Sequence, residues 1–390
     1  MYKIQTLNAI SDVIFGQLGD RYTVSPDMQE PDAILVRSAA MQDTALPDSL
    51  LSIARAGAGV NNIPVDKCSQ LGICVFNTPG ANAGAVCELT LAGLLLSGRD
   101  VTGGVEWAKT LKGQGAAVEK QVEKGKGQFV GPEIAGKRLG VVGLGAIGLR
   151  VANAAAALGM NVMGFDPAIT VEHAWLLSRQ IERAGSLDEL LAACDYVTLH
   201  VPLTDGTRGM IGTDALRKVK KGVRVLNFSR GGLVDSAAML SALADGTVAR
   251  YVTDFPSDDL LLVKNVLCIP HLGASTPESE ENCAVMAARQ TRDYLENGSI
   301  QNSVNLPDVA LAPVSKPRIC LIHQNIPNVL GSITAAVSAQ RLNISDLVNR
   351  SRASLAYTVV DLDEMPQNPD ALQTSLAAID GMLRVRMLGM

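Results

Sequence analysis

The sequence has few of the residues that build metal sites or all-β cores. Its seven cysteines are scattered along 390 residues and none forms a C-x-x-C pair, so we expect no metal site and a reduced, cytoplasmic protein. Aromatic residues make up only 4% of the chain, whereas glycine occurs 36 times, which favours an Ala/Gly/Val/Leu-rich α/β core. Only four histidines are present, so few side chains can exchange a proton near neutral pH.

Long apolar runs and an excess of positive charge are also missing. No run approaches the roughly 18 apolar residues that a membrane span requires, and the first residues lack the basic and then apolar segments of a secretory signal. The 34 Lys and Arg residues are outnumbered by 39 Asp and Glu residues, giving a net charge of −5. We therefore expect no membrane partner and no uniformly basic surface for a nucleic acid. At about 150 residues per domain, the length predicts two to three domains.

Strands alternate with helices along most of the chain. Alternation is visible from residue 33 to 100, weakens between 101 and 137, and becomes strong from Lys137. Short apolar strands are expected at 138–143, 161–166, 195–202, 223–228, 250–255 and 265–270. Such strands separated by helices predict a parallel sheet that is covered on both faces. A longer helix is expected over about 277–296, with Thr276 as its N-cap and Pro277 at its first position.

The last part of the chain predicts a separate small unit. Prolines at 307, 313 and 317 mark a linker. The pattern after it reads strand (318–323), helix (329–340), strands (345–352 and 356–363), helix (370–378) and strand (383–388). This βαββαβ order is that of a ferredoxin-like fold.

A glycine-rich turn predicts a dinucleotide site. Gly143, Gly145 and Gly148 match G-x-G-x-x-G, and they lie directly between a predicted strand and a predicted helix. Glycines there allow a tight turn and bring a pyrophosphate close to backbone N–H groups at the helix N-terminus. Asp166 ends the next strand, 18 residues after Gly148, where an acid would bind the adenine ribose diol. Because an acid there repels a 2′-phosphate, NAD is favoured over NADP.

Two further side chains that could take part in binding or catalysis follow strands of the same sheet. Arg230 comes after 223–228, before two glycines, and an arginine fork suits the capture of a carboxylate. His271 comes after 265–270 and can relay a proton near neutral pH. Asp258 and Asp259 precede it, and a neighbouring carboxylate would support the imidazolium. His200 also ends a strand, and we expect it to line the cofactor pocket, whereas His173 is expected at the surface.

Four ordered segments resemble the signatures of the D-2-hydroxyacid dehydrogenases, and within them the branch that oxidises 3-phosphoglycerate in serine biosynthesis. They are residues 55–90, the turn at 138–148, the arginine block at 227–235 and the histidine block at 270–276. The resemblance implies two doubly wound Rossmann-like domains, with the nucleotide domain inserted into the substrate domain. We expect a substrate domain at 1–95 and 282–306, an NAD-binding domain at 96–281, a linker at 307–317 and a regulatory domain of the ACT type at 318–390.

The resemblance also implies the roles of particular residues. The family's Arg–Glu–His triad maps to Arg230, an acid and His271, and this sequence has aspartate where the family has glutamate. Counting without gaps places Asp259 there, which we prefer, and aligning on Phe255 places Asp258. The expected NAD neighbours are Gly143, Gly145, Ala146, Ile147, Gly148, Asp166, His200, Pro202, Phe228, Ser229, Arg230, Asp254, His271 and Gly273.

Substrate and effector residues are implied in the same way. Arg37 and Arg55 match positions that face the substrate phosphate, and Gly57 and Gly59 together with Arg230 complete the expected substrate site. In the regulatory domain, His323, Asn325 and Asn343 resemble a serine-binding pattern, and Asn328 stands where the family has glycine. L-serine is therefore the expected effector, and the alternative is a domain that serves only in assembly.

The resemblance implies NAD-dependent oxidation of 3-phospho-D-glycerate to 3-phosphohydroxypyruvate by a cytoplasmic homo-oligomer. Two alternatives stay open. One is a related dehydrogenase for a non-phosphorylated 2-hydroxy acid, against which Arg37 and Arg55 argue. The other is a non-catalytic NAD-sensing protein of the same fold, since such proteins keep the triad.

Overall fold

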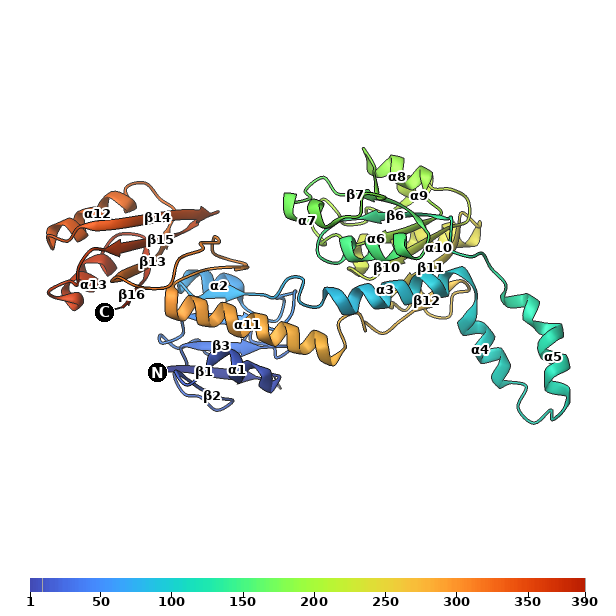
Figure 1. Cartoon of the computed structure of the whole chain (residues 1–390), viewed down its shortest axis with the longest axis horizontal. Coiled ribbons are helices and arrows are strands. Elements are labelled where there is room, and N and C mark those ends of the chain that lie inside the picture. The colour runs from blue at the N-terminus through green and yellow to red at the C-terminus, as the bar shows by residue number, and fades with distance from the viewer. Residues whose placement is uncertain (9, 390) are drawn as a thin grey trace. The chain divides into compact units, whose positions relative to one another are not determined.

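The computed structural model describes residues 1–8 and 10–389, and it divides into two compact units. The first unit joins residues 1–82 to the residues from 280 onward, and the second consists of residues 83–279. Together they contain three separate sheets (Figure 1). The mixed α/β composition and the parallel sheets confirm the predicted fold class.

The first unit contains a five-stranded parallel sheet of order β2-β1-β3-β4-β5. Its strands are β1 (Tyr2–Leu7), β2 (Tyr22–Ser25), β3 (Ala33–Val36), β4 (Ser52–Arg55) and β5 (Cys74–Phe76). Its helices are η1 (Asp12–Ile14), α1 (Phe15–Leu18), α2 (Val65–Gln70) and the long α11 (Pro277–Asn297), whose first three residues belong to the second unit. The carboxyl ends of β3 and β4 carry Arg37 and Arg55.

The C-terminal part of the first unit has the predicted βαββαβ order. Its elements are β13 (Arg318–Gln324), α12 (Val329–Ala339), β14 (Ile344–Arg352), β15 (Leu355–Leu362), α13 (Pro369–Ala377) and β16 (Met382–Leu388). The strands form an antiparallel sheet of order β14-β15-β13-β16. This arrangement is ACT-like.

Both faces of this antiparallel sheet are covered. Because side chains alternate along a strand, Ile319 and Leu321 of β13 pack with α12 and α13. Cys320 and Ile322 point the other way, into a core shared with β1 and α11. Arg386 of β16 reaches the end of α11, where its guanidinium lies 4.5 Å from the Tyr294 ring centroid. The small sheet is therefore fastened to the rest of its unit by buried contacts.

The second unit is built on a seven-stranded parallel sheet of order β12-β11-β10-β9-β6-β7-β8. Its strands are β6 (Arg138–Val142), β7 (Asn161–Phe165), β8 (Glu182–Arg183), β9 (Tyr196–Leu199), β10 (Val223–Asn227), β11 (Val248–Thr253) and β12 (Val266–Cys268). The strand order reverses between β6 and β9, and ligands of open α/β sheets bind at such a switch point.

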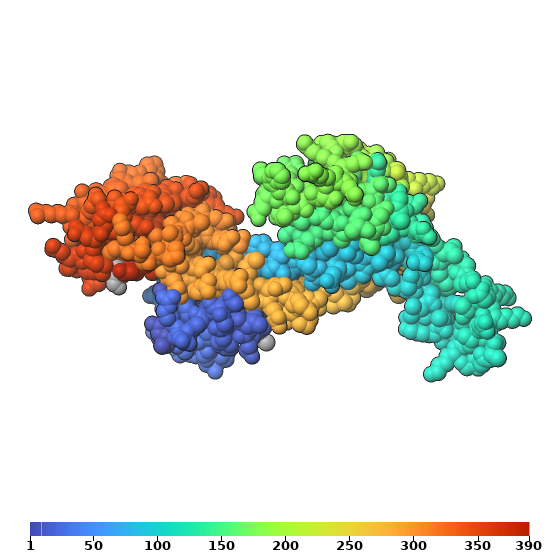
Figure 2. All heavy atoms as spheres, viewed as in Figure 1, coloured from blue at the N-terminus to red at the C-terminus, as the bar shows by residue number. Residues whose placement is uncertain are grey.

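The helices of the second unit are α3 (Ala83–Gly98), α4 (Val101–Lys109), α5 (Ala117–Gly125), η2 (Lys126–Phe129), α6 (Gly148–Ala157), α7 (Val171–Leu176), α8 (Leu187–Ala193), α9 (Thr213–Leu216), η3 (Gly231–Leu233) and α10 (Ser236–Ala244). Helices α3 and α6 pack on one face of the sheet, and α8 and α10 pack on the other. Within this unit, α4 and α5 project as a pair from the other elements (Figure 2).

Helix α3 lies in the second unit, whereas the sequence assigned its first 13 residues to the substrate domain. The reason is its packing against the nucleotide sheet. Val86 and Leu94 belong to the same core as Val141 of β6 and Val252 of β11. A Cβ on Gly93 would lie 2.6 Å from the Phe228 ring, so the helix approaches that ring closely.

Candidate active site

The glycine turn after β6 leaves space for a ligand at one position and none at the other two. A Cβ on Gly143, whose φ is +89°, would lie 2.6 Å from the carbonyl oxygen of His200. A Cβ on Gly148 would lie 1.9 Å from the carbonyl oxygen of Gly143. At Gly145 a Cβ would meet nothing within 4 Å. The outer two glycines are therefore required for close packing, and the middle one leaves its backbone open to a phosphate.

Asp166 follows β7 and is fixed beside this turn. Its carboxylate accepts hydrogen bonds from the backbone N–H of Leu144 and of Ala168, both at 2.8 Å. Each carboxylate oxygen keeps a second lone pair for a ribose hydroxyl. Ala146 and Ile147, the two residues between the last two glycines, are half-buried. The turn and Asp166 together fit the phosphates and ribose of a dinucleotide.

His200 lies at the end of β9, beneath the glycine turn. Its Nε2 is 3.0 Å from the hydroxyl of Thr198, and its Nδ1 is buried without a hydrogen-bond partner among the described residues. Burial lowers the pKa of His200 to about 3. The imidazole is therefore neutral at physiological pH and packs near the cofactor site without exchanging protons.

We expect this buried imidazole to destabilise the fold in acid. As the pH falls below 6.5, the unfolded chain takes up a proton at His200 that the folded chain does not, so stability is lost at up to about 1.4 kcal/mol per pH unit. When the pH falls from 7 to 5, the free energy of unfolding of His200→Gln should decrease by about 2 kcal/mol less than that of the wild type. Urea unfolding followed by tryptophan fluorescence measures this, because Trp107 and Trp175 both lie in the second unit.

His173→Gln is the matched control, since His173 lies in α7 of the same unit and is only partly buried. If the wild type and His200→Gln lost equal stability between these two pH values, the burial argument would be wrong.

Pro202, Phe228 and Ser229 lie at the same carboxyl edge of the sheet. Pro202 is exposed beyond β9, and Phe228 is buried at the end of β10. The Ser229 hydroxyl donates to the carbonyl of Val201 at 2.8 Å, which ties the loop after β10 to the loop after β9. These residues bring the loop that carries Arg230 toward the glycine turn.

The side chain of Arg230 is exposed at this edge and has few internal partners. Its Nη1 donates to the carbonyl of Ser229 at 2.6 Å. Its own carbonyl accepts from Nδ2 of the buried Asn227 at 2.9 Å, so the backbone is fixed while the guanidinium faces solvent. The remaining N–H groups can take a carboxylate in a bidentate fashion.

His271 is held in an unusual backbone conformation. Its φ is +35°, a region that non-glycine residues rarely occupy and that concentrates at functional sites. Its N–H is shared between the carbonyls of Asp254 and Ile269, both at 3.0 Å. The imidazole lies over Phe255, with ring centroids 4.7 Å apart, and is exposed.

Asp254 is the buried carboxylate of this region. Burial raises its pKa, while the nearby His271, the backbone N–H of Gly273 and Arg230 favour the charged form. A Cβ on Gly273 would lie 3.1 Å from the Asp254 carboxylate, so glycine allows this close approach. The triad candidates Asp258 and Asp259 are both exposed, and Asp259 accepts from the hydroxyl of Ser257 at 2.5 Å.

In the first unit, Arg37 directly follows β3, and Arg55 is the last residue of the neighbouring strand β4. Nε of Arg55 donates to the carbonyl of Arg37 at 3.0 Å, and Arg37 forms an ion pair with Glu280 at the start of α11. Gly57 has a φ of +153°, and a Cβ there would lie 2.6 Å from the Arg55 guanidinium. Gly57 and Gly59 are half-buried beside these arginines. Two guanidinium groups on adjacent strand ends suit a dianion.

Sequence reasoning missed two residues of this cluster. Glu280 is 243 residues from Arg37, so no local pattern could pair them. Thr78 is buried, and its hydroxyl accepts from the N–H of Gly57 at 2.7 Å. Thr78 could have been singled out from the sequence by its position in the Thr-Pro-Gly segment after β5.

The three effector candidates differ in exposure. His323 is buried, with Nδ1 2.7 Å from the Gln324 carbonyl and Nε2 2.8 Å from the Thr358 hydroxyl. Asn325 and Asn343 are exposed, and Asn343 donates to Asp363. Asn328 has a φ of +71°, the left-handed conformation for which glycine is the usual residue and asparagine a common substitute.

Residues 1–8 and 10–389 contain no group of three or more His, Cys, Asp or Glu side chains that could hold a metal ion. Over the same range, no helix has the length and apolar character needed to cross a membrane.

Comparison with solved structures identifies the same fold. The NAD⁺-bound 3-phosphoglycerate dehydrogenase of Entamoeba histolytica matches with a TM-score of 0.58 and 25% identity, over 78% of this chain and 98% of that chain. A glyoxylate reductase from Paecilomyes thermophila matches with a TM-score of 0.63 and 25% identity, over 78% and 98% of the two chains.

Sequence comparison agrees. Residues 106–273 match the family model described as "D-isomer specific 2-hydroxyacid dehydrogenase, NAD binding domain". The D-3-phosphoglycerate dehydrogenase of Methanocaldococcus jannaschii is 34% identical over 330 residues, which is 82% of this chain and 60% of that relative. The matches span only 52% to 60% of the length of the first three curated relatives. Residues 106–273 therefore match the NAD-binding domain of the D-isomer-specific 2-hydroxyacid dehydrogenases, and four fifths of the chain is similar to a D-3-phosphoglycerate dehydrogenase.

Proposed function

We propose that this protein oxidises 3-phospho-D-glycerate to 3-phosphohydroxypyruvate with NAD, the first step of L-serine synthesis. The observation that carries the proposal is the carboxyl edge of the nucleotide sheet, where the glycine turn, Arg230 and His271 follow strands of one unit. The paired arginines of the first unit supply the phosphate specificity. The curated D-3-phosphoglycerate dehydrogenases to which the chain is similar support the same substrate.

The cofactor site fits NAD. The open backbone at Gly145 receives the pyrophosphate, and Asp166 binds the ribose diol and repels a 2′-phosphate. Ala146, Ile147, Pro202, Phe228 and Ser229 line the same edge. Bound at this site, NAD would supply the acceptor for the hydride on C2 of the substrate.

The chain's own residues would carry out the remaining chemistry. Arg230 binds the substrate carboxylate and polarises the C2 oxygen. His271 takes the proton of the C2 hydroxyl, and a neighbouring carboxylate stabilises the imidazolium. We keep Asp259 as the triad acid, with Asp258 as the alternative. The buried Asp254 supplies negative charge close to His271 in either case.

Organisation and regulation are part of the same proposal. We infer a cytoplasmic homo-oligomer that associates through the nucleotide unit, where the projecting α4 exposes Val101 and Val105. We propose, as from the sequence, that residues 318–390 form the regulatory domain. Because the ring nitrogens of His323 have internal partners, L-serine would bind there chiefly through Asn325 and Asn343.

Removal of the Asp166 carboxylate should weaken NADH binding about tenfold or more, because the ribose diol loses a charged acceptor. Asp166→Ala should also reduce the difference in affinity between NADH and NADPH, because the substitution removes the charge that repels a 2′-phosphate. Fluorescence titration with each nucleotide measures both effects. Unchanged NADH affinity in Asp166→Ala would show that the carboxylate does not contact the ribose.

The substrate is tested by following NADH at 340 nm with 3-phosphoglycerate, D-glycerate and D-lactate. We expect 3-phosphoglycerate to be preferred. Arg37→Gln should raise KM for 3-phosphoglycerate about 10- to 100-fold, the cost of one charged hydrogen-bond partner, and should leave the two other acids unaffected. Glu280→Gln is the matched control, because it frees Arg37 from its ion pair and should not raise KM. Equal rates with all three acids would favour the related dehydrogenase, and NADH binding without any turnover would favour the NAD-sensing protein.

A further inference from the structure

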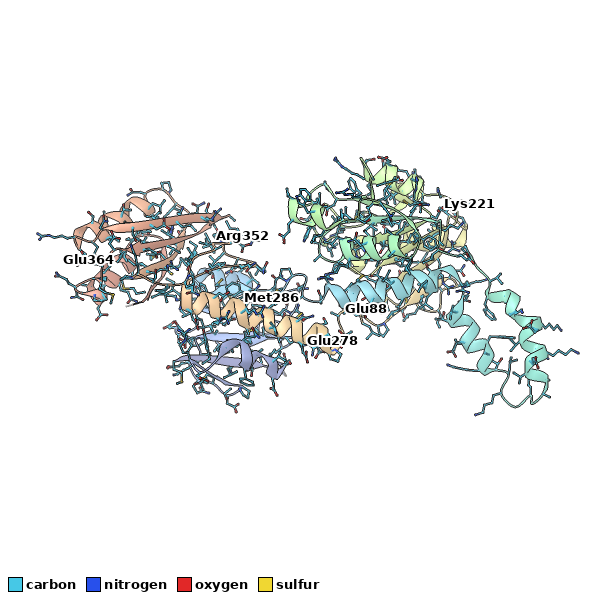
Figure 3. The ribbon with its side chains drawn as sticks, viewed as in Figure 1. Glu88, Lys221, Glu278, Met286, Arg352 and Glu364 are labelled. Atoms are coloured by element: carbon cyan, nitrogen blue, oxygen red, sulfur yellow. The ribbon has the colours of Figure 1, made fainter. Side chains whose placement is uncertain are left out.

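A cavity of about 640 Å³ lies within the first unit, away from the residues discussed so far. It is lined by α11, by residues 299–311 and by β14. These three walls are fastened together. The backbone groups of Ile300 and Val309 pair in both directions. Arg352, which is labelled in Figure 3, lies at the end of β14. It donates to the carbonyl of Ser303 at 2.6 Å. The cavity therefore has a fixed shape, and its size suits a small-molecule ligand.

The α11 wall of the cavity contains a buried amide without partners. Gln290 is 6% exposed, and neither its Nε2 nor its Oε1 has a hydrogen-bond partner among the described residues. A buried amide that is left unpaired costs free energy. A ligand that supplies a donor and an acceptor would remove this cost, so the amide itself points to an occupant.

Charges of both signs line the cavity without neutralising each other. Asp308 and Arg350 are exposed, and neither forms an ion pair with any residue that the structure describes. The third charged residue, Asp293, is 3.3 Å from Nη2 of the adjacent Arg292. A ligand with one positive and one negative group would pair with Asp308 and Arg350 together.

Apart from the polar Ser299 and Gln301, the remaining lining residues are apolar. Leu311 and Val348 are half-buried and pack against the core of the unit, and Ala310 lies beside Leu311. We propose that this cavity binds a free α-amino acid with a large apolar side chain. Its ammonium group pairs with Asp308 and its carboxylate with Arg350, Gln290 bonds to a polar atom, and the side chain contacts Leu311 and Val348. The site is separate from His323, Asn325 and Asn343, none of which lines the cavity.

Calorimetric titration of the full chain with L-leucine tests the proposal without any measurement of activity. Binding of one L-leucine per chain is expected. N-acetyl-L-leucine lacks the ammonium group, L-leucinamide lacks the carboxylate and L-alanine lacks the large apolar side chain, so each should bind at least tenfold more weakly. Asp308→Asn, Arg350→Gln and Gln290→Leu should each weaken L-leucine binding by a similar factor.

Matched controls separate this site from others. Asp346→Asn and Arg341→Gln change exposed charges of the same C-terminal part that do not line the cavity, and both should bind L-leucine as the wild type does. Asn343→Ala should also leave the affinity unchanged. The proposal is overturned if no heat is seen with L-leucine, if the analogues bind as well as L-leucine, or if Asp308→Asn and Arg350→Gln bind it normally. NADH titration of each variant reports separately on the cofactor site.

Discussion

Replacing His271 with alanine is expected to lower kcat/KM for 3-phosphoglycerate by about 10²–10⁴, the usual contribution of a general base. The imidazole takes the proton of the C2 hydroxyl, and no other histidine replaces it, because His200 is buried with a pKa of about 3. Steady-state rates at 340 nm give the loss. NADH affinity, measured by fluorescence titration, should persist because the glycine turn and Asp166 are untouched.

Controls for this prediction separate the base from its neighbours. Arg230→Ala should lose activity on a similar scale with a higher KM, since it removes a substrate contact. Asp259→Asn should shift the pH–rate profile to lower pH by withdrawing support for the imidazolium, and Asp258→Asn should not. Wild-type turnover by His271→Ala would disprove the proposed proton transfer.

Arg386→Ala should lower the free energy of unfolding of the first unit by about 2–4 kcal/mol, in the range of a large-to-small core substitution. Arg386 is buried, its guanidinium stacks on Tyr294, and it donates to the carbonyl of Leu295 at 3.0 Å. The substitution removes this stacking and leaves a void between β16 and α11. Hydrogen exchange of α11 and β16 peptides locates the loss.

Two comparisons make this result specific. Arg386→Met keeps most of the side-chain volume and should recover more than half of the loss. Tryptophan fluorescence should report an unchanged second unit, because both tryptophans lie there. If hydrogen exchange in α11 were the same in Arg386→Ala and the wild type, the small sheet would not depend on this contact.

Much of the fold follows from local patterns. The Thr276 hydroxyl caps α11 as predicted, accepting from the N–H of Ser279 at 3.1 Å. The strand that precedes the glycine turn and the βαββαβ order could also be predicted from the sequence, because strong apolar runs and caps delimit each element. Strands β1 and β2 were not predicted. Only Ile4 in β1 and Tyr22 in β2 are buried, so neither strand has a clear apolar pattern.

The candidate site could be predicted only in part from the sequence, because its details depend on contacts between residues that are far apart along the chain. Residue types and strand ends indicated Arg230 and His271, but the positive φ of His271 and its position over Phe255 come from tertiary packing. The pairing of Arg37 with Glu280 joins β3 to a helix near the other end of the chain. The free amide of Gln290 becomes informative only when the cavity beside it is seen.

The discontinuous first unit constrains how the chain folds during its synthesis. Residues 1–82 leave the ribosome before the whole second unit, yet their core includes Ala284, Tyr294 and Leu388. The second unit is continuous in sequence and can fold as soon as it has emerged. Meanwhile the five-stranded sheet lacks the helix that covers it and exposes apolar surface. Translation slowed after residue 279 would prolong that interval, so aggregation of nascent chains should increase most with pauses in this region.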